Sequence, residues 1–414
     1  MTDIHRKFHL SREQLCDIRD YMEQGILHGL TAHHQEIKAL PAYLRRPCAI
    51  LNGETTALDV GGTNIRAAWI RISENIPVFL SGPVSDQEGI MRRSEKIGRI
   101  TDHQFFAKQA DLITEVCRKQ RIKVGYCFSF PAEIRPGCSA TLLRWTKDIH
   151  IDNVIGTSVG DRLRTELHER GRFVQNIPVI NDAAASLLSG ALIAPECTHT
   201  IGLIAGTGTN MASFFPVSRI TKLFPDDCKG WNADDEMAVN LESGNLTPPH
   251  LTEFDDRLDS SNIHDHPASQ RFEKAVSGAY LPRLFALVAG RDKCLQLGFD
   301  SDTPGVHAGM IASIRDQHSS VGKIAAAVID RSADLLAAAA AGLIRTYEQG
   351  QKQVAILAEG SLFWQTPGYC ERFQQTLIQL INKGTTVKLL QCPIGYDANL
   401  LGAACAALST GSDA

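Results

Sequence analysis

The sequence predicts an α/β protein with more than one domain, and three observations support this. Its 414 residues suggest roughly two to three domains, and the 43% hydrophobic content is ample for sizeable cores. Segments typical of strands and helices alternate between residues 57 and 193. A strand, a glycine-rich turn ending in Thr-Asn and a second strand occur twice, at 57–70 and 201–215. This recurrence favours an internal duplication over two unrelated glycine-rich hairpins.

Composition and charge restrict the classes of partner. A net charge of −4 with both signs well mixed gives no general attraction to nucleic acid or acidic membrane. The 11 cysteines are scattered and lack Cys-x-x-Cys spacing, which argues against a disulfide framework and a zinc knuckle. No apolar segment follows the basic residues near Met1, and the apolar run from Leu335 to Ile344 is too short to span a bilayer. We therefore expect a cytoplasmic protein with a small ligand and a buried helix at that run.

Local patterns predict the elements of the first half. Ser11 and Gln14 form a capping-box sequence, and apolar residues at helical spacing then predict an amphipathic helix that ends near Gly29. Helical spacing predicts further helices over 105–120, 159–170 and 183–193. Strand-forming residues predict strands over 57–60, 65–70, 123–130 and 174–180.

The second half follows the same rules. We expect strands within 201–215 on either side of the second glycine-rich turn, and at 354–357 and 387–390. The polar composition of 248–268 predicts a surface excursion. Helical patterns predict helices over 272–289, 320–347, 369–382 and 399–408.

The turn after the first strand has the composition of a phosphate-binding loop. Gly61 and Gly62 can take positive φ and expose backbone N–H groups to a phosphate, and the Thr63 hydroxyl adds a donor. Asp59, at the end of the strand, could hold a hydrated magnesium ion beside the phosphates. An ordinary β-hairpin with a structural Gly-Gly turn is the alternative. The second loop would face the first across a cleft and clamp a polyphosphate, which suggests ATP.

Asp182 is the candidate carboxylate for phosphoryl transfer, which needs a group that takes the proton of the acceptor. It lies where a predicted buried strand ends and a helix begins, the edge at which α/β sheets place ligands. Aspartate is also a favoured N-cap residue, so a purely structural role explains it equally well.

These motifs resemble the hexokinase family, the ATP-dependent hexose kinases of the actin-like ATPase (ribonuclease H-like) superfamily, along nearly the whole chain. The similar segments are Leu58 to Arg66, Phe128 to Lys147, Ile180 to Asp182, Gly206 to Asn210, Val239 to Gly244, Phe272 to Gly278, Glu359 to Ser361 and Asp397 to Gly402. The resemblance implies two domains with a cleft between them. The smaller one comprises 57–181 with a C-terminal helix at 398–414, and the larger one 1–56 with 182–397.

The resemblance also implies roles for individual residues. Asp182 would take the proton from the 6-hydroxyl of a hexose, and Lys147 would stabilise charge on the transferred phosphoryl group. Taken alone, Lys147, Glu242 and Glu273 are more simply explained as solvated surface charges. The implied sugar contacts are Thr146, Lys147, Asn181, Asp182, Asn210, Glu242 and Glu273. The implied Mg-ATP contacts are Asp59 (on Mg2+ through water), Gly61, Gly62, Thr63, Asn64, Arg66, Gly206, Thr207, Gly208, Gly360, Ser361 and Asn399.

Two positions depart from the family pattern. Glu133 occupies a position where the resemblance implies a sugar-contacting serine. It could bind a sugar hydroxyl itself, or point away and leave the contact to Ser129 or a backbone group. Ser243 stands where the family commonly has tryptophan.

The expected function is therefore ATP-dependent phosphorylation of a hexose, most simply glucose, at its 6-hydroxyl, the first step of glycolysis. The expected protein is a monomer or homodimer with Mg2+ and ATP. A sugar sensor that has lost catalysis is the main alternative, motivated by Glu133. A sugar kinase of the repressor-related family would normally carry a Cys/His zinc motif, which is not found in this sequence. An actin-like assembly protein would share only the loops.

Overall fold

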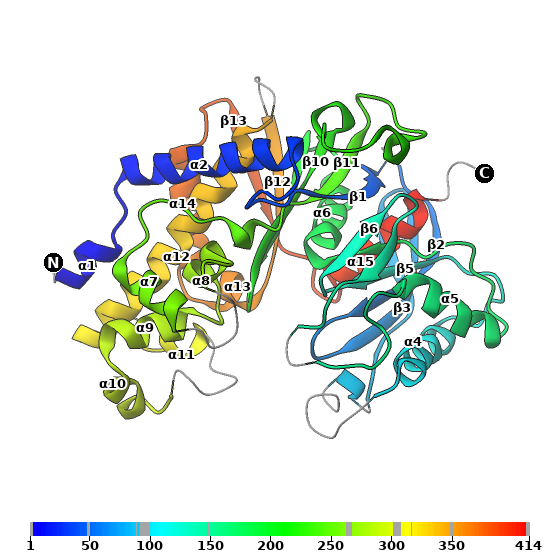
Figure 1. Cartoon of the computed structure of the whole chain (residues 1–414), viewed down its shortest axis with the longest axis horizontal. Helices are drawn as coiled ribbons and strands as arrows, with labels where there is room; N and C mark the ends of the chain where they lie inside the picture. The colour runs from blue at the N-terminus through cyan, green and yellow to red at the C-terminus, as the bar shows by residue number, and fades with distance from the viewer. Residues whose placement is uncertain are drawn as a thin grey trace.

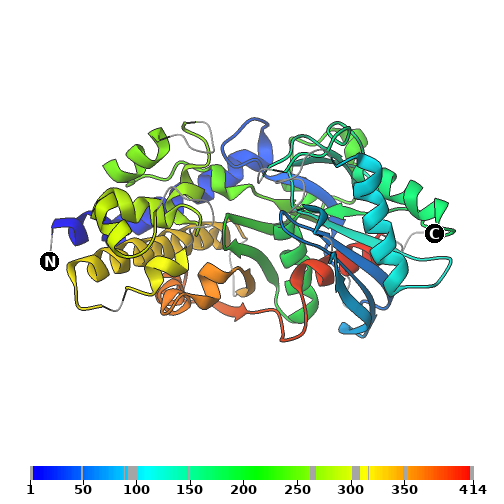
Figure 2. The same ribbon diagram turned by 90° about the horizontal axis from the view of Figure 1, so that it is seen from below.

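Two β-sheets, one in each of two lobes, organise the protein in this computed structural model (Figure 1). The structure describes residues 3–47, 50–87, 89–91, 100–146, 149–261, 267–300, 308–315, 317–347 and 352–410. Seen from below, the two lobes lie side by side along the long axis, and the chain ends lie at opposite extremes (Figure 2).

The first sheet has five strands in the order β4-β3-β2-β5-β8. Its strands are β2 (Gly53–Val60), β3 (Ile65–Ser73), β4 (Ile76–Ser85), β5 (Val124–Phe128) and β8 (Val179–Ile180). The strand β3 is antiparallel to its two neighbours, β4 and β2, whereas β2, β5 and β8 run parallel to one another. The strands β6 (Ala132–Arg135) and β7 (Ser139–Leu142) form a separate two-stranded antiparallel sheet.

The second sheet repeats that plan and adds one strand. Its order is β1-β11-β10-β9-β12-β13, in which β9, β10 and β11 are antiparallel neighbours and β9, β12 and β13 run parallel. The strands are β1 (Leu40–Arg45), β9 (His199–Ala205), β10 (Thr209–Pro216), β11 (Glu236–Asn240), β12 (Lys352–Glu359) and β13 (Thr385–Leu390). The shared strand order supports the internal duplication that the two glycine-rich turns predict.

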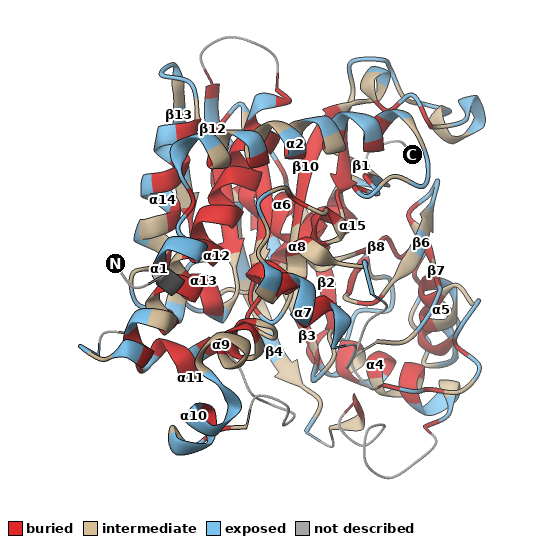
Figure 3. Ribbon diagram, turned by 60° about the vertical axis from the view of Figure 1, so that its left-hand side comes forward, coloured by how far each residue is buried: buried red, intermediate tan, exposed pale blue. Residues whose placement is uncertain are grey.

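Two helices connect the lobes. The helix α6 (Asp182–Ile193) packs on β9, β10 and β12, and the C-terminal helix α15 (Ala398–Ser409) packs on β2 and β5. They also pack against each other, and close approach is possible because Gly402 faces the Ala185 carbonyl, where an added Cβ would lie only 2.2 Å away. Buried residues lie along these two helices and along the strands of both sheets (Figure 3).

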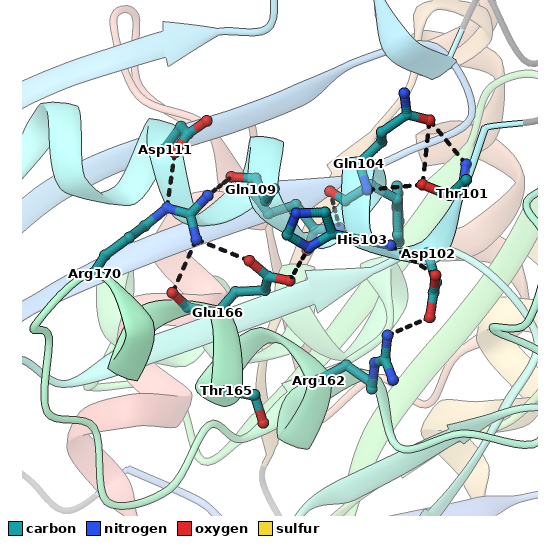
Figure 4. A network of polar contacts seen from close by, with 12 residues as sticks. Thr101, Asp102, His103, Gln104, Gln109, Asp111, Arg162, Thr165, Glu166 and Arg170 are labelled. Carbon is teal, nitrogen blue, oxygen red and sulfur yellow. Dashed lines mark hydrogen bonds and ion pairs between the residues drawn. The ribbon is translucent and has the colours of Figure 1, made fainter.

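Further helices cover the outer faces of the sheets. In the smaller lobe α4 (Asp102–Val116) lies beside α5 (Val159–Glu169), and Arg170 joins them through Asp111 and Glu166, each at 2.8 Å (Figure 4). In the larger lobe the long helix α12 (Ser320–Arg345) is central. Around it lie α1 (Asp3–Phe8), α2 (Arg12–Thr31), α7 (Glu253–Ser260), α8 (Arg271–Val276), α9 (Leu281–Ala289), α10 (Arg291–Gln296), α11 (Ala308–Ala312), α13 (Ser361–Gln365) and α14 (Tyr369–Leu380).

Most predicted elements are confirmed, with three corrections. The predicted helix over 272–289 is broken into α8 and α9, because the Gly278 N–H donates to the Gly206 carbonyl at 2.8 Å and holds the chain away from helical geometry. The predicted strand over 174–180 shrinks to β8, since Pro178 has no N–H for a ladder. The polar segment 248–268 is not only an excursion, because it contains α7 with Asp255 buried against Arg331. In the part of the chain that is described, no helix is long and apolar enough to cross a membrane.

Candidate active site

The carboxyl ends of β2, β5 and β8 bring one group of predicted residues to the same edge of the first sheet. Cys127 of β5 pairs with Asp59 on one side and with Ile180 on the other. The next residues along the chain therefore also lie at this edge, and the Ser129 N–H donates to the Val60 carbonyl at 3.1 Å. Asp182, two residues after Ile180, begins α6 beside them.

Asn181, and not Asp182, is the N-cap of α6. Its side chain accepts a hydrogen bond from the Ala184 N–H at 2.9 Å, while Asp182 is the first helical residue and Oδ1 accepts from the Ala183 N–H at 2.8 Å. The capping role that an aspartate could have explained is therefore filled by its neighbour. Asn181 itself, predicted as a sugar contact, uses its side-chain oxygen for this cap.

The first glycine loop forms the predicted tight turn between β2 and β3, closed by a 3.0 Å hydrogen bond from the Gly61 N–H to the Asn64 carbonyl. The expectation of positive φ at Gly61 and Gly62 is wrong, because neither adopts it. An added Cβ at Gly61 would approach protein no closer than 3.9 Å, at the Asn64 oxygen. Backbone conformation and packing thus do not require a glycine at position 61, whereas close approach of a ligand would.

The second glycine loop connects β9 to β10 and is tightly packed. The Gly206 N–H donates to the Gly208 carbonyl at 3.0 Å, and the Ala279 N–H donates to the Thr207 carbonyl at 3.2 Å. Gly360, at the end of the neighbouring β12, has a φ of +122°, and an added Cβ would lie 2.3 Å from the Ala205 oxygen. Gly206 of the predicted phosphate loop and Gly360, a predicted nucleoside contact, therefore lie against each other.

Three predicted sugar contacts gather at the other side of this loop. The Glu273 Oε2 accepts a hydrogen bond from the Thr209 N–H at 2.9 Å. Asn210 and Glu242 are joined through Asn240, which accepts from the Asn210 Nδ2 at 2.8 Å and donates to the Glu242 Oε1 at 2.7 Å. Amides and carboxylates in such an arrangement offer donors and acceptors to neighbouring hydroxyl groups.

The charges of the two groups of residues act on each other. Burial raises the pKa of Glu242, the hydrogen bond from Asn240 lowers it, and the charge of Asp182 raises it further. The cations Arg144 and Lys38 act in the opposite direction. Asp182 begins α6, which packs on the second sheet, and Glu242 follows β11 of that sheet, so both carboxylates belong to the larger lobe.

Another group of polar contacts lies beside the first glycine loop, where α15 begins. The guanidinium of Arg66 donates to Asp59 at 2.5 Å and to Asp397 at 2.5 Å, and Asn399 donates to the other Asp59 oxygen at 3.1 Å. Burial works against the charge of Arg66, but the two carboxylates outweigh it and raise the pKa. Burial raises the pKa of Glu359, at the end of β12, to about 7, and the charge of Asp397 adds to this.

The remaining predicted residues are placed as follows. Glu133 lies on β6 with half of its side chain exposed and pairs with Arg135 at 3.3 Å. Thr146 is half-buried and its backbone carbonyl accepts from the Ile149 N–H at 3.3 Å, and Lys147 lies outside the described residues. Ser361 is exposed at the start of α13. A groove of about 650 Å³ between α14 and β13 contains none of the predicted site residues.

Four residues of this region were not predicted from the sequence: Lys38, Arg144, Asn240 and Asp397. Arg144, Asn240 and Asp397 fall inside segments that resemble the hexokinase family, and a polar residue at the end of the apolar run Met237 to Val239 was a usable signal for Asn240. The residue types of Lys38 and Arg144 gave no signal, because their relevance depends on their effect on Glu242 in the folded chain.

This fold and this set of residues define a class of protein. Two lobes of repeated topology, each with a glycine loop where its parallel strands end, match the actin-like ATPase fold of sugar kinases. A ROK hexokinase from Thermus thermophilus shares the fold, with a TM-score of 0.54 at 18% identity over 85% of this chain and 97% of that one.

Hexokinase family models match residues 1–192 in one case and 200–292 with 304–409 in another. The chain belongs to the hexokinase family. It is 27% identical over 455 residues to the hexokinase of Schistosoma mansoni, covering 98% of this chain and 97% of that protein. A structure of that hexokinase complexed with glucose has a TM-score of 0.78 to this one at 26% identity, with 98% and 97% coverage. Human hexokinase-2 is 27% identical over 438 residues, and the chain spans about half of its length, 46%.

Proposed function

We propose that this protein transfers the γ-phosphoryl group of ATP to the 6-hydroxyl of a hexose, with glucose as the first candidate, and releases a hexose 6-phosphate. The observation that carries the proposal is the position of Asp182 at the start of α6, where its charge acts on Glu242 of the Asn210, Asn240 and Glu242 cluster. An acceptor hydroxyl held by that cluster is presented to this carboxylate.

Asp182 is the general base in this proposal. It needs to lie within hydrogen-bond reach of the hydroxyl and to be free of a competing structural role. The cap of α6 is supplied by Asn181, and Asp182 uses Oδ1 alone, toward the Ala183 N–H, among the described residues, which supports the availability of its other oxygen. Lys147 would stabilise charge on the transferred group.

The sugar is held by hydrogen bonds from both lobes. Glu242, Glu273 and Asn210 come from the larger lobe, and Thr146 and Asn181 from the smaller one. Glu133 is half exposed and engaged with Arg135, which supports the alternative that it points away from the sugar. Ser129, at the edge beside Val60, then supplies the contact.

ATP would lie between the two glycine loops, with Gly360, Ser361 and Asn399 toward the nucleoside. The set of side chains fits magnesium, which keeps several waters and uses one or two carboxylates together with substrate phosphates. Asp59 would hold the ion through water, and its oxygens are oriented by Arg66 and Asn399. Magnesium would neutralise phosphate charge when bound.

The proposal also covers the division into domains, the cellular location and the oligomeric state. Residues 57–181 with the C-terminal helix form the small domain, supported by the packing of α15 on β2 and β5. Residues 1–56 and 182–397 form the large domain, except that β2 already begins at Gly53. We place the protein in the cytoplasm, in the first step of glycolysis, as a monomer or homodimer.

A coupled assay with Mg-ATP and a panel of glucose, mannose and fructose tests the proposal. Turnover with at least one hexose, abolished when magnesium is chelated, is the expected result, and no turnover with any of them contradicts it. The Glu133→Ser variant is assayed beside the parent. Unchanged relative kcat/KM values across the panel are expected if Glu133 points away from the sugar, whereas an altered hexose preference would place it in the site. The sensor alternative predicts hexose binding without turnover.

A further inference from the structure

Asn240 connects two predicted sugar contacts from a rigid position. It is the last residue of β11, is 6% exposed and is paired with Ala212 of β10 on one side and Leu40 of β1 on the other. Its backbone is therefore fixed by two neighbouring strands. Its side-chain amide points along the sheet edge to Asn210 and Glu242.

The orientation of the Asn210 amide is fixed by its surroundings. Its Oδ1 accepts hydrogen bonds from the Met211 N–H at 2.8 Å and the Ser243 N–H at 3.1 Å, so its Nδ2 must face the Asn240 oxygen. An amide nitrogen carries two hydrogens, and one of them is used by this bond. Among the described residues no acceptor takes the second, which leaves it for a ligand oxygen.

Glu242 is held by the same amide through two bonds. Its backbone is left-handed, with φ 53° and ψ 47°, a conformation that costs a non-glycine residue about 1 kcal/mol or more. Its N–H donates to the Asn240 Oδ1 at 3.3 Å, and its Oε1 accepts from the Asn240 Nδ2 at 2.7 Å. Within the described part of the chain no donor reaches its Oε2.

We propose that Asn240 is a positioning residue that determines which atoms of Asn210 and Glu242 face the sugar. Its oxygen takes one hydrogen of the Asn210 amide and its nitrogen donates to the Glu242 Oε1, so the second Asn210 hydrogen is left to donate to the sugar and the Glu242 Oε2 is left to accept from it. Neighbouring hydroxyls of a hexose are then required to match that pattern, and a sugar that lacks one of them leaves a buried group unpaired. The inference rests on the proposed function, since it concerns the same site.

Two variants test the roles of the oxygen and the nitrogen of the Asn240 side chain. Asn240→Asp keeps the size and the acceptor toward Asn210 but removes the donor toward Glu242, and Asn240→Ala removes both. In each we expect the KM for glucose to rise about tenfold or more, with the KM for ATP changed less than about twofold. The parent is compared on glucose and on 2-, 3- and 4-deoxyglucose, and the ratio of kcat/KM for glucose to kcat/KM for each deoxy sugar is its discrimination. For the deoxy sugar that the parent rejects most strongly, this ratio should be at least about tenfold smaller in the variants.

The pH profile gives a second measurement. Both oxygens of Glu242 act purely as acceptors only when the carboxyl is ionised. Burial and the charge of Asp182 raise the pKa of Glu242, whereas the hydrogen bond from Asn240 and the charges of Arg144 and Lys38 lower it. Loss of that bond raises the pKa, so the acid limb of kcat/KM for glucose should move to higher pH. The shift should be larger in Asn240→Asp, whose new carboxylate adds a like charge.

Asn245→Ala is the matched control. Asn245 is in the same turn and donates to the Glu242 carbonyl at 3.1 Å, but it has no bond to the Glu242 carboxylate or to Asn210. We expect its glucose KM within about threefold of the parent. The proposal is overturned if the Asp variant keeps the glucose KM, deoxy-sugar penalties and pH profile of the parent, or if Asn245→Ala reproduces the effects of Asn240→Ala.

Stability is measured in parallel by thermal melting without sugar. If the Ala variant does not fold, the isosteric Asp variant decides the question, and if neither folds, Asn240 is a structural residue and the proposal fails. Failure of the proposed function is a separate result, because the parent would then show no turnover with any hexose.

Discussion

Gly208→Ala should displace one sugar-binding carboxylate without unfolding the protein. An added Cβ would lie 2.8 Å from the Glu273 Oε2, which is 0.6 Å short of the 3.4 Å at which ordinary contact begins. Gly208 does not have positive φ, so alanine is allowed there, and the carboxylate is the flexible end of a side chain. A retreat of roughly 0.6 Å would take its 2.9 Å bond to the Thr209 N–H close to the limit of a hydrogen bond.

Loss of one hydrogen bond between a charged group and the sugar costs about 1.5–3 kcal/mol, a factor of about 10 to 150 in KM. We therefore expect the hexose KM of Gly208→Ala to rise by at least about tenfold, while the free energy of unfolding changes by less than about 1 kcal/mol. The assay is steady-state kinetics with both substrates varied, combined with urea denaturation.

A double-mutant cycle with Glu273→Ala tests the cause. Because both changes act on one carboxylate, Gly208→Ala should have little further effect on hexose KM once Glu273 is truncated. An equal effect in both backgrounds, or a rise confined to the KM for ATP, would show that Gly208 acts on the phosphates and would refute the reasoning.

Three further predictions concern charged groups. Asp59→Asn should lower kcat/KM for Mg-ATP at least tenfold by weakening the anchor of Arg66, with glucose affinity by calorimetry within about twofold of the parent. Glu359→Gln should be more stable than the parent above pH 7, by up to about 3 kcal/mol, and should lose that advantage as pH falls toward 4.5. Between pH 4.5 and 7 the raised pKa lets the folded parent keep a proton that the unfolded chain has released, so the parent loses stability as the pH rises and the glutamine variant does not. Asp255→Ala should destabilise by about 3–5 kcal/mol in urea, since it leaves the 1% exposed Arg331 without its partner, whereas a loss under 1 kcal/mol would contradict a buried ion pair.

The local parts of this structure could be predicted from the sequence. The capping box at Ser11 and Gln14 and the apolar spacing after it define α2, and the composition around Gly61 defines the first hairpin. These features depend on residues a few positions apart, whose interactions are largely set by the geometry of one helix or one turn.

The rest depends on contacts between distant segments. The break between α8 and α9 is imposed by the Gly206 carbonyl, and the bond from Arg66 to Asp397 forms only because α15 packs on the first sheet. The structural alternative for Asp182 could be removed only by seeing which side chain caps α6. Asn240 lies in a segment that resembles the hexokinase family, but its role depends on strand pairing that brings it beside Asn210.

The role of Asp182 is tested most directly by comparing the parent with Asp182→Ala in a coupled assay with Mg-ATP and glucose. Asn181 still caps α6 in this variant, so we expect it to fold and to bind glucose with measurable affinity by calorimetry. Loss of a general base should lower kcat by about 10²- to 10⁴-fold. A variant that binds glucose and retains more than about a tenth of the parental kcat would contradict the assignment of Asp182 as the base.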